Sequence, residues 1–402
     1  MLIAHCAWAT PLTLPDAIAR ALKFAPSMQA AAAQSDMSRA QVREQRSALF
    51  PSISTGGEYY NAPGYDDVIT NRALSTAMVM MNFTAWDWGR RQARVRAARY
   101  VAEAAQLGIA AAQAQIAYDT AVAYYELLRA RSATSELARS LDRLTRYVAT
   151  IDALKNSGRA NSADTLKVRT ARDAVEIALL QQQVAVRRAS VTLGSLIGEF
   201  NQPDLQVAEL PDLPSKPAVD FSASPVMQAT RRAISSAGLQ VKAAKAERLP
   251  TVQLAFTTGF LGIDPRPTWS QNYGGSYDTV VSMPILDGGL ITSHIDQAKA
   301  RQNSALAQAR DTEYALNRRI TDASLRYDQS ARMLDLLGRA QPNADDSFAL
   351  TWTRFLGGGD VTLLEVLDAY QRAEDLRMQR FEQEFAARES AAEINLLAGR
   401  IR

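Results

Sequence analysis

Few side chains in this sequence are suited to nucleophilic or metal chemistry. Its 402 residues include a single cysteine, Cys6, and two histidines, His5 and His294. These numbers exclude a cluster of thiolate or imidazole metal ligands and argue against a Ser-His-Asp or Cys-His site. No two carboxylates have the surroundings of a general acid and base, and the phosphate-binding motif G-x-x-x-x-G-K-[ST] does not occur. We therefore expect that the protein is not an enzyme and uses no metal or cofactor.

The first nine residues differ from the rest of the chain. They contain Ala7-Trp8-Ala9, which fits the small-x-small pattern of a signal-peptidase site, although a charged segment before it is missing. We expect residues 1–9 to be the remnant of a signal peptide. The alternatives are an ordinary chain end and a lipid anchor on Cys6, where His5 stands in place of the expected small residue. A mature chain without cysteine suits an envelope protein built without disulfides.

The most informative pattern is an internal duplication. Four segments recur in the same order at offsets of 199 to 201 residues. They begin at Ala25, Phe50, Asp87 and Leu193, and they return at Ser224, Leu249, Asp287 and Ile394. The chain therefore consists of two copies of one supersecondary unit, residues 10–202 and residues 223–402. Residues 203–222 form a linker that contains Pro203, Pro211, Pro214 and Pro217.

Each copy has the same order of elements: a helix, two strands, a long helix, a turn and a last helix. In the first copy we expect helices at 15–49, 88–155 and 162–198 and strands at about 52–61 and 75–85. In the second copy we expect helices at 225–248, 288–355 and 361–398 and strands at about 251–259 and 277–285. Proline and glycine mark the boundaries, and an aspartate precedes each long helix as a cap. The predicted fold is mainly α with a small β part and an internal two-fold repeat.

The first long helix carries the seam of a coiled coil. Leu137, Leu141, Leu144, Val148 and Ile151 are spaced by four and three residues in turn, which is the period of a left-handed coiled coil. By itself this pattern fits a soluble periplasmic coiled-coil adaptor or structural protein equally well. No run of about 18 uncharged apolar residues occurs, so we predict no transmembrane helix.

The strands favour a different class of protein. Apolar residues alternate with polar ones in 251–257 and 277–283, as they do in the strands of a membrane β-barrel. Aromatic residues near the strand ends are suited to girdles at the membrane surfaces; they are Tyr59, Tyr60, Trp86, Trp88 and Trp269. Four strands cannot close a barrel, and unpaired strand edges are not tolerated in lipid. Three chains with four strands each would supply about twelve, so we expect a homotrimer.

The charged residues agree with a membrane setting. The formal net charge of +3 is small for this length, and nucleic-acid binding needs a concentrated basic face. The one basic cluster has no counterpart in the second copy; it consists of Arg90, Arg91, Arg94, Arg96 and Arg99. We expect these arginines at the boundary between membrane and water, near anionic lipid headgroups, and we expect no nucleic-acid partner.

The duplicated layout resembles the TolC-like outer-membrane efflux proteins. The resemblance rests on the strand-to-helix junctions at 83–89 and 284–289 and on the turn-plus-helix runs at 158–166 and 359–367. It also rests on the Leu-x-x-Leu-x-Gly endings of the two copies, and it spans nearly the whole mature chain. The resemblance implies a homotrimeric export duct: a twelve-strand β-barrel in outer-membrane lipid, continued by a long α-helical barrel into the periplasm.

The same resemblance implies the partners. The periplasmic tip would dock on a periplasmic adaptor (membrane fusion) protein and, through it, on an inner-membrane RND or ABC transporter. That transporter would supply the energy, so the duct itself needs no nucleotide site. Drug or small-molecule export is the function we expect. The outer-membrane component of a type I protein secretion system is an alternative that the sequence does not separate from it.

Two acidic residues are assigned to the pore by the resemblance. In that family, acids on the innermost helix surround the narrow periplasmic tip and favour cations, and Glu365 and Asp368 match this position. The first copy has Asp164 and Lys167 at the equivalent places, so only the second copy would supply both acids. Three copies of two carboxylates around a pore would concentrate negative potential. The alternative role is that of acids at the N-terminus of a solvated helix.

The family's gate near this turn uses tyrosine and arginine contacts. The corresponding turn here, residues 354–360, contains three consecutive glycines, and this run departs from a tightly bonded turn. Candidate gate or adaptor contacts are therefore spread over the turns of both copies; they are Gly158, Arg159, Asp164, Arg354, Gly358 and Gly359.

Overall fold

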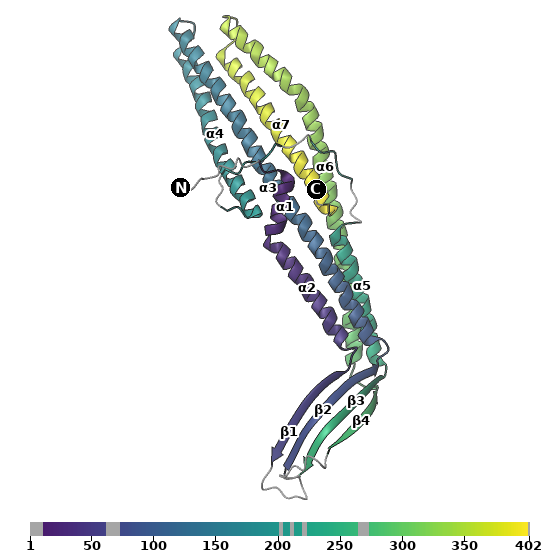
Figure 1. Cartoon of the computed structure of the whole chain (residues 1–402). Helices are drawn as coiled ribbons and strands as arrows, with labels where there is room; N and C mark the ends of the chain where they lie inside the picture. The colour runs from purple at the N-terminus through teal and green to yellow at the C-terminus, as the bar shows by residue number, and fades with distance from the viewer. Residues whose placement is uncertain are drawn as a thin grey trace, which may run out of the picture. The chain divides into compact units, whose positions relative to one another are not determined.

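The computed structural model describes residues 11–61, 73–200, 204–209, 213–218, 223–263 and 273–400. The expected signal-peptide remnant at 1–9 and the expected girdle residue Trp269 lie outside these residues. The chain forms two compact units. We call Met1–Ala30, Ala110–Pro225 and Tyr314–Arg402 the helical unit, and Ala31–Ile109 and Val226–Glu313 the sheet unit. Figure 1 identifies the elements of both units.

The helical unit is built from two long hairpins. The first pairs the later part of α3 (Arg90–Asn156) with α4 (Ser162–Ile197), and the second pairs the later part of α6 (Leu290–Leu356) with α7 (Leu363–Leu397). The helices α3 and α6 have 67 residues each, or roughly 100 Å at 1.5 Å per residue, and both run through the two units. Leu144 and Ile151 of the predicted seam are fully buried. The helix α6 continues past Pro342, which the sequence analysis did not consider.

A single helix over 15–49 was a wrong prediction. The structure has α1 (Leu14–Phe24) and then α2 (Pro26–Ser47), separated at Ala25. Ala25 has a ψ angle of 120°, because the ring of a proline disfavours helical geometry in the residue before it. The break turns Phe24 onto the end of α4, where its ring packs against Phe200 at 5.7 Å.

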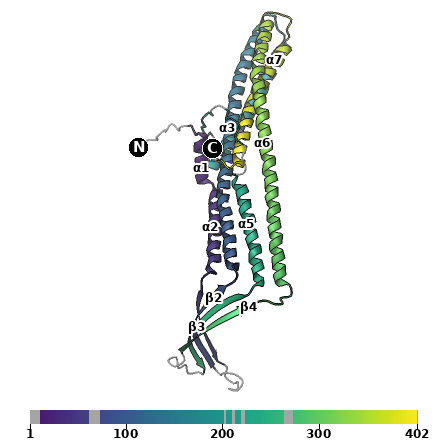
Figure 2. The same ribbon diagram turned by 90° about the vertical axis from the view of Figure 1, so that its right-hand side faces the viewer.

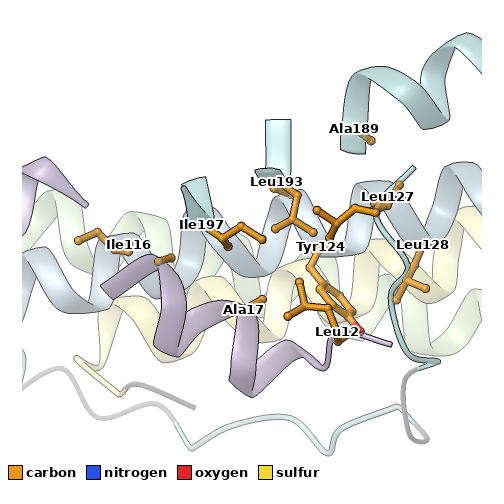
Figure 3. Packing of buried hydrophobic residues seen from close by; sticks show 12 residues of the cluster. Leu12, Ala17, Ile116, Tyr124, Leu127, Leu128, Ala189, Leu193 and Ile197 are labelled. Carbon is orange, nitrogen blue, oxygen red and sulfur yellow. Dashed lines mark hydrogen bonds between the residues drawn. The ribbon is translucent and has the colours of Figure 1, made fainter. Parts of the chain in front are cut away.

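The main core of the helical unit lies where α1, α3 and α4 meet (Figure 3). Tyr124 of α3 is fully buried there beside Leu127 and Leu193. Its hydroxyl lies 2.9 Å from the carbonyl oxygen of Leu12 and 2.7 Å from that of Ala208. Burial raises the pKa of Tyr124 to about 12. One tyrosine thus fixes both the N-terminal segment and the linker to the long helix.

The sheet unit contains one antiparallel sheet. Its strands are β1 (Ser52–Asn61), β2 (Ala73–Trp86), β3 (Thr251–Ile263) and β4 (Tyr273–Ser282), in the order β1-β2-β3-β4. The prediction of a strand at 277–285 was wrong at its end, because β4 stops before Pro284, which has no N–H to donate.

The helices of the sheet unit are α2, α5 (Pro225–Lys245) with the short η1 (Ala246–Arg248), and the first parts of α3 and α6, as Figure 2 shows.

The register divides this sheet into an apolar face and a polar face. Met81 stands opposite Ile53 on one side and Phe256 on the other, and Phe256 stands opposite Tyr277. Since directly opposed residues share a face, the apolar face is one surface across all four strands; it also holds Tyr59, Val79, Phe83, Val252, Leu254, Phe260, Tyr273 and Val281. The more polar face carries Glu58, Thr76, Asn82, Gln253, Ser276 and Asp278, and it also includes the apolar residues Met78, Met80, Leu261 and Val280.

The strand-to-helix junction of the first copy is held by Asp87 and Arg91. Asp87 is buried, and its carboxylate accepts hydrogen bonds from the backbone N–H groups of Gly89 (3.2 Å) and Arg91 (2.9 Å) and from Arg91 Nε (2.8 Å). Arg91 also donates to the carbonyl oxygens of Ala48 (2.8 Å) and Thr84. The side-chain pair therefore joins the end of α2, the end of β2 and the start of α3.

At the strand-to-helix junctions of both copies, the long helix begins two residues later than predicted. The expected starts at 88 and 288 were wrong, since α3 begins at Arg90 and α6 at Leu290. Trp88 has a φ of 55° and Gly288 a φ of 62°, so neither has right-handed helical geometry. In the second copy Asp287 makes the equivalent backbone contacts, to Gly289 and Ile291, but Ile291 offers no charge.

Replacing Asp87 by asparagine should destabilise the sheet unit. The variant leaves the mostly buried Arg91 without its counter-ion, which costs about 2–3 kcal/mol of unfolding free energy. Burial opposes ionisation of Asp87, but the hydrogen bonds from Arg91 outweigh it and lower the pKa of this carboxyl. Its contribution is therefore present above about pH 4 and is lost as the pH falls through the lowered pKa. Circular dichroism during unfolding in detergent measures both effects.

Asp287→Asn is the matched control, because Asp287 is exposed and caps its helix without an arginine. Asparagine caps helices about as well as aspartate, so this variant should lose only a few tenths of a kcal/mol. Equal losses in the two variants would show that the Asp87–Arg91 pair has no special role.

Candidate functional site

The candidate site is the pair of turns that close the two hairpins of the helical unit. After α3, Gly158 has a φ of 75°, and Arg159 N–H donates to the carbonyl oxygen of Leu154 at 2.8 Å. After α6, Gly358 has a φ of 74°, and Gly359 N–H donates to the carbonyl oxygen of Arg354 at 3.0 Å. Both turns are Schellman motifs, which need glycine at the left-handed position. The expectation that the glycine run departs from a tightly bonded turn was therefore wrong, because Gly358 and Gly359 both donate to carbonyl oxygens of α6.

One side chain connects the two turns. Arg159 Nη2 donates to the carbonyl oxygen of Leu356, the last residue of α6, at 2.6 Å. This carbonyl is among those that a helix leaves unsatisfied at its end. Position 359, the equivalent of 159 in the second copy, is glycine, so there is no reciprocal contact from the second turn. Arg354 contributes only its backbone carbonyl, because its exposed side chain makes no hydrogen bond or ion pair with the described residues.

The predicted acids have a local structural role as well. Glu365 forms a capping box with Thr362: its carboxylate accepts from Thr362 N–H at 2.9 Å, and its own N–H donates to Thr362 Oγ1 at 3.4 Å. Asp164 forms the same arrangement with Asn161 at the start of α4. The sequence analysis recognised neither box, although the spacing of three residues is the usual signal.

The acids differ in how far neighbouring cations offset them. Asp368 is exposed and pairs with Arg372 one helical turn later at 2.8 Å, and Asp164 lies 3.6 Å from Lys167. Glu365 forms no ion pair with the described residues, and Asp360 in the turn itself is another exposed acid that the sequence analysis missed. Among the described residues no cation therefore offsets Glu365, whereas Arg372 partly offsets Asp368.

A buried cluster fixes the orientation of these acids. Leu363 and Val366 of α7 are buried and pack with Ile151 of α3 and Val168 of α4. Tyr370, also buried, lies with its ring centroid 6.1 Å from that of Tyr147 of α3. The ring of Tyr147 adds contacts to α6; its centroid lies 4.4 Å from that of Trp352. Since one face of α7 is held in this way, Glu365 and Asp368 stand on the opposite, exposed face.

A network of charged residues lies deeper in the hairpins, and the sequence analysis did not find it. Arg143 of α3 contacts the buried Glu136 at 2.9 Å and Glu374 of α7 at 2.7 Å, and Arg377 joins Glu374 to Asp345 of α6. Burial raises the pKa of Glu374 despite the two arginines. The signal was present, since Glu136 and Arg143 lie seven residues apart beside the apolar seam.

Among the described residues no group of three or more His, Cys, Asp or Glu side chains is arranged to hold a metal ion. No helix among them is both long and apolar enough to cross a membrane.

A groove of about 740 Å³ lies between α3, α4 and α7, and its lining includes Leu137, Leu166, Leu364 and Asp368. The groove is open, and its lining also includes Glu136 and Glu374 of the charged network and Tyr370.

Replacing Arg159 by alanine should loosen the two turns. The variant removes a charge-assisted hydrogen bond to the end of α6, which is worth about 1–2 kcal/mol at an exposed position. Hydrogen exchange of the backbone amides at 156–162 and 356–362 should become several-fold faster. Arg354→Ala is the control, because that side chain has no such partner. Unchanged exchange in Arg159→Ala, or equal changes in both variants, would contradict a tether.

Comparisons with known proteins give the family. The profile described as "Outer membrane efflux protein" matches residues 17–199 and 222–400, one match in each copy of the repeat. The chain is 23% identical over 297 residues to the outer membrane efflux protein BepC of Brucella suis, an alignment that covers 73% of this chain and 65% of BepC. The chain thus spans less than two thirds of that relative's length.

Two further comparisons cover more of the chain. It is 24% identical over 379 residues to the toluene efflux pump outer membrane protein TtgF of Pseudomonas putida, which covers 88% of this chain and 76% of TtgF. The crystal structure of the outer membrane protein VceC from Vibrio cholerae superposes with a TM-score of 0.86 and 20% identity over 97% of each chain. The match to VceC confirms the predicted fold of four strands and long helices. Because the profile matches both copies and most of the sequence, the chain belongs to the outer membrane efflux protein family.

Proposed function

We propose that three copies of this protein form an export duct for drugs or other small molecules in the outer membrane. The observation that carries the proposal is the four-stranded sheet with one apolar face. Ile53, Met81, Phe256 and Tyr277 lie in one row across it. Such a face needs lipid or a core to cover it, and the helices of the sheet unit lie beyond one end of the strands and do not cover the sheet (Figure 2).

The edges of the sheet support the number of copies. Within the described residues β1 and β4 each have a neighbour on one side only. Open edges leave backbone N–H and C=O groups unpaired, which lipid does not tolerate. Pairing β1 of one copy with β4 of the next closes a barrel, and three copies give twelve strands. The polar face, with Glu58, Gln253 and Asp278, then lines the lumen.

The aromatic residues fit this orientation with one exception. Trp86 and Trp88 are exposed at the helix end of the sheet, and Tyr59 and Tyr273 lie on the apolar face near its other end. These two groups correspond to the two membrane surfaces. Tyr60 lies on the polar face, opposite Leu74, so we leave it out of the girdle.

The helices continue the duct into the periplasm. The two turns at its end, with Gly158, Arg159, Gly358 and Gly359, provide a surface for a periplasmic adaptor, which connects the duct to an inner-membrane RND or ABC transporter. TtgF is named for a toluene efflux pump, which favours small-molecule export over type I protein secretion. A soluble coiled-coil adaptor is the weaker candidate, because it would have no use for the apolar face of the sheet.

At the tip, Glu365 supplies the negative charge that selects cations. Three copies of an unpaired carboxylate around a narrow opening concentrate negative potential. Asp368 adds less, since Arg372 lies 2.8 Å away.

Glu365→Gln should reduce the preference of the duct for cations. Glutamine is also accepted in a capping box, so the variant removes the charge and keeps the helix start. We expect the cation-to-anion permeability ratio in planar bilayers to fall several-fold, and Asp368→Asn to have a smaller effect. Asp164→Asn is the control, because Asp164 has the same cap geometry at the start of α4. Unchanged selectivity in Glu365→Gln would remove this residue from the pore.

Thr362→Ala tests the structural role separately. It removes the hydroxyl that caps α7 but leaves the charge of Glu365 in place. We expect a loss of about 1 kcal/mol in stability with cation preference retained. A loss of selectivity as large as that of Glu365→Gln would mean that the cap geometry, and not the charge, controls the pore.

A further inference from the structure

Two arginines near the start of α3 have no partner among the described residues. Residues 90–102 contain five arginines and no acid. Arg91 is used by the junction with Asp87, and Arg94 contacts Glu247 at 3.0 Å. Arg96 and Arg99 are exposed and make no hydrogen bond or ion pair with the residues that the structure describes. They lie three residues apart and therefore on one side of the helix.

These two arginines line a groove between α3 and α5. The groove has a volume of about 500 Å³; its walls are formed by Arg96, Arg99, Tyr100 and Glu103 of α3 and by Ser235, Gly238 and Leu239 of α5. The small side chains at 235 and 238 leave room beside the guanidinium groups. Glu103 is offset by Arg232, whose Nε lies 3.2 Å from it. The groove therefore has a positive side that its own acid does not neutralise.

The second copy of the repeat serves as an internal comparison. The positions equivalent to Arg96 and Arg99, 200 residues later, hold Asp296 and Lys299. Those two side chains pair with each other at 3.2 Å. The second copy thus has an ion pair where the first has two unpaired guanidinium groups. The helical fold therefore does not require the arginine pair.

The location of the groove indicates its ligand. Arg96 and Arg99 lie six and nine residues after the start of α3 at Arg90, which corresponds to roughly 10–15 Å along the helix. Side chains of a helix lean towards its N-terminus, so both guanidinium groups are directed back towards the sheet. Exposed Trp86 and Trp88 lie at the same end of the sheet. Arginine binds phosphate oxygens through paired N–H donors.

We infer that the groove lined by Arg96 and Arg99 binds the phosphate group of an anionic phospholipid in the periplasmic leaflet. This inference rests on the proposed function, which sets the height of the sheet in the membrane. The two guanidinium groups hold the phosphate, and Leu239 and the ring of Tyr100 contact the glycerol and the first acyl carbons. Each protein chain binds one such lipid, through the first of its two repeats.

Native mass spectrometry of the full chain in detergent tests the inference. The purified protein is titrated with short-chain phosphatidylglycerol, with short-chain phosphatidylcholine, or with inorganic phosphate. We expect one phosphatidylglycerol per chain, weaker binding of phosphatidylcholine, and no displacement of the lipid by equimolar phosphate. The double variant Arg96→Gln/Arg99→Gln should bind phosphatidylglycerol at least tenfold more weakly, and Arg96→Asp/Arg99→Lys, which copies the second repeat, should lose it.

Arg187→Gln/Arg188→Gln is the matched control. It removes the same charge from two exposed arginines of α4 that also lack an ion pair among the described residues, and it should bind lipid as the unmodified protein does. Equal lipid binding in the Arg96/Arg99 variants would overturn the inference, as would displacement by equimolar phosphate, which would indicate a site for free anions. Bilayer conductance of the same preparations keeps the two proposals apart: a conducting protein without lipid selectivity contradicts only the lipid site, and a protein that forms no channel contradicts the duct.

Discussion

Backbone hydrogen bonding at the edges of a four-stranded sheet is the constraint on which the rest of this structure depends. The sheet joins two halves of the chain that lie about 200 residues apart, through the pairing of β2 with β3. That pairing satisfies the inner strands and leaves β1 and β4 each with one neighbour among the described residues. An apolar face spans all four strands, so the sheet is suited to lipid, where an open edge is most costly. The proposed assembly of three copies follows from these two features together.

The duplicated backbone carries different side chains at equivalent positions, and these differences change the contacts that each copy of the repeat makes. Asp87 and Asp287 cap the two long helices in the same way, yet only the first is reinforced by an arginine. Arg159 reaches the end of α6, whereas its counterpart is Gly359. The two repeats have equivalent backbones. One repeat can therefore carry an ion pair, a contact between turns or a binding group that the other lacks.

Glu365 combines a structural contact with the exposure that its proposed role in the pore requires. Its carboxylate completes the cap of α7 and remains exposed at the tip. The cap holds the carboxylate in a defined position at the N-terminus of α7, where the helix dipole favours negative charge. The buried face of α7, through Val366 and Tyr370, keeps that position from rotating.

The sequence by itself determined the class of fold. Proline, glycine and aspartate at equivalent positions of the two copies act through local backbone geometry, and the order of helices and strands could therefore be predicted from neighbouring residues. The prediction nevertheless missed the helix break at Ala25, although the effect of Pro26 on the residue before it is local. The acids at the tip were assigned through a family resemblance, and their capping boxes were readable at a spacing of three residues.

Only the tertiary structure decided which distant residues meet. The two faces of the sheet depend on a register between strands that are far apart in the chain, and the alternation in β1 and β2 was too weak to predict it. The contact from Arg159 to Leu356 joins residues 197 positions apart, and the contact from Arg143 to Glu374 joins residues 231 positions apart. Hydrogen bonds and ion pairs act over a few ångströms, so no pattern within one segment can specify a partner that folding brings to it from another.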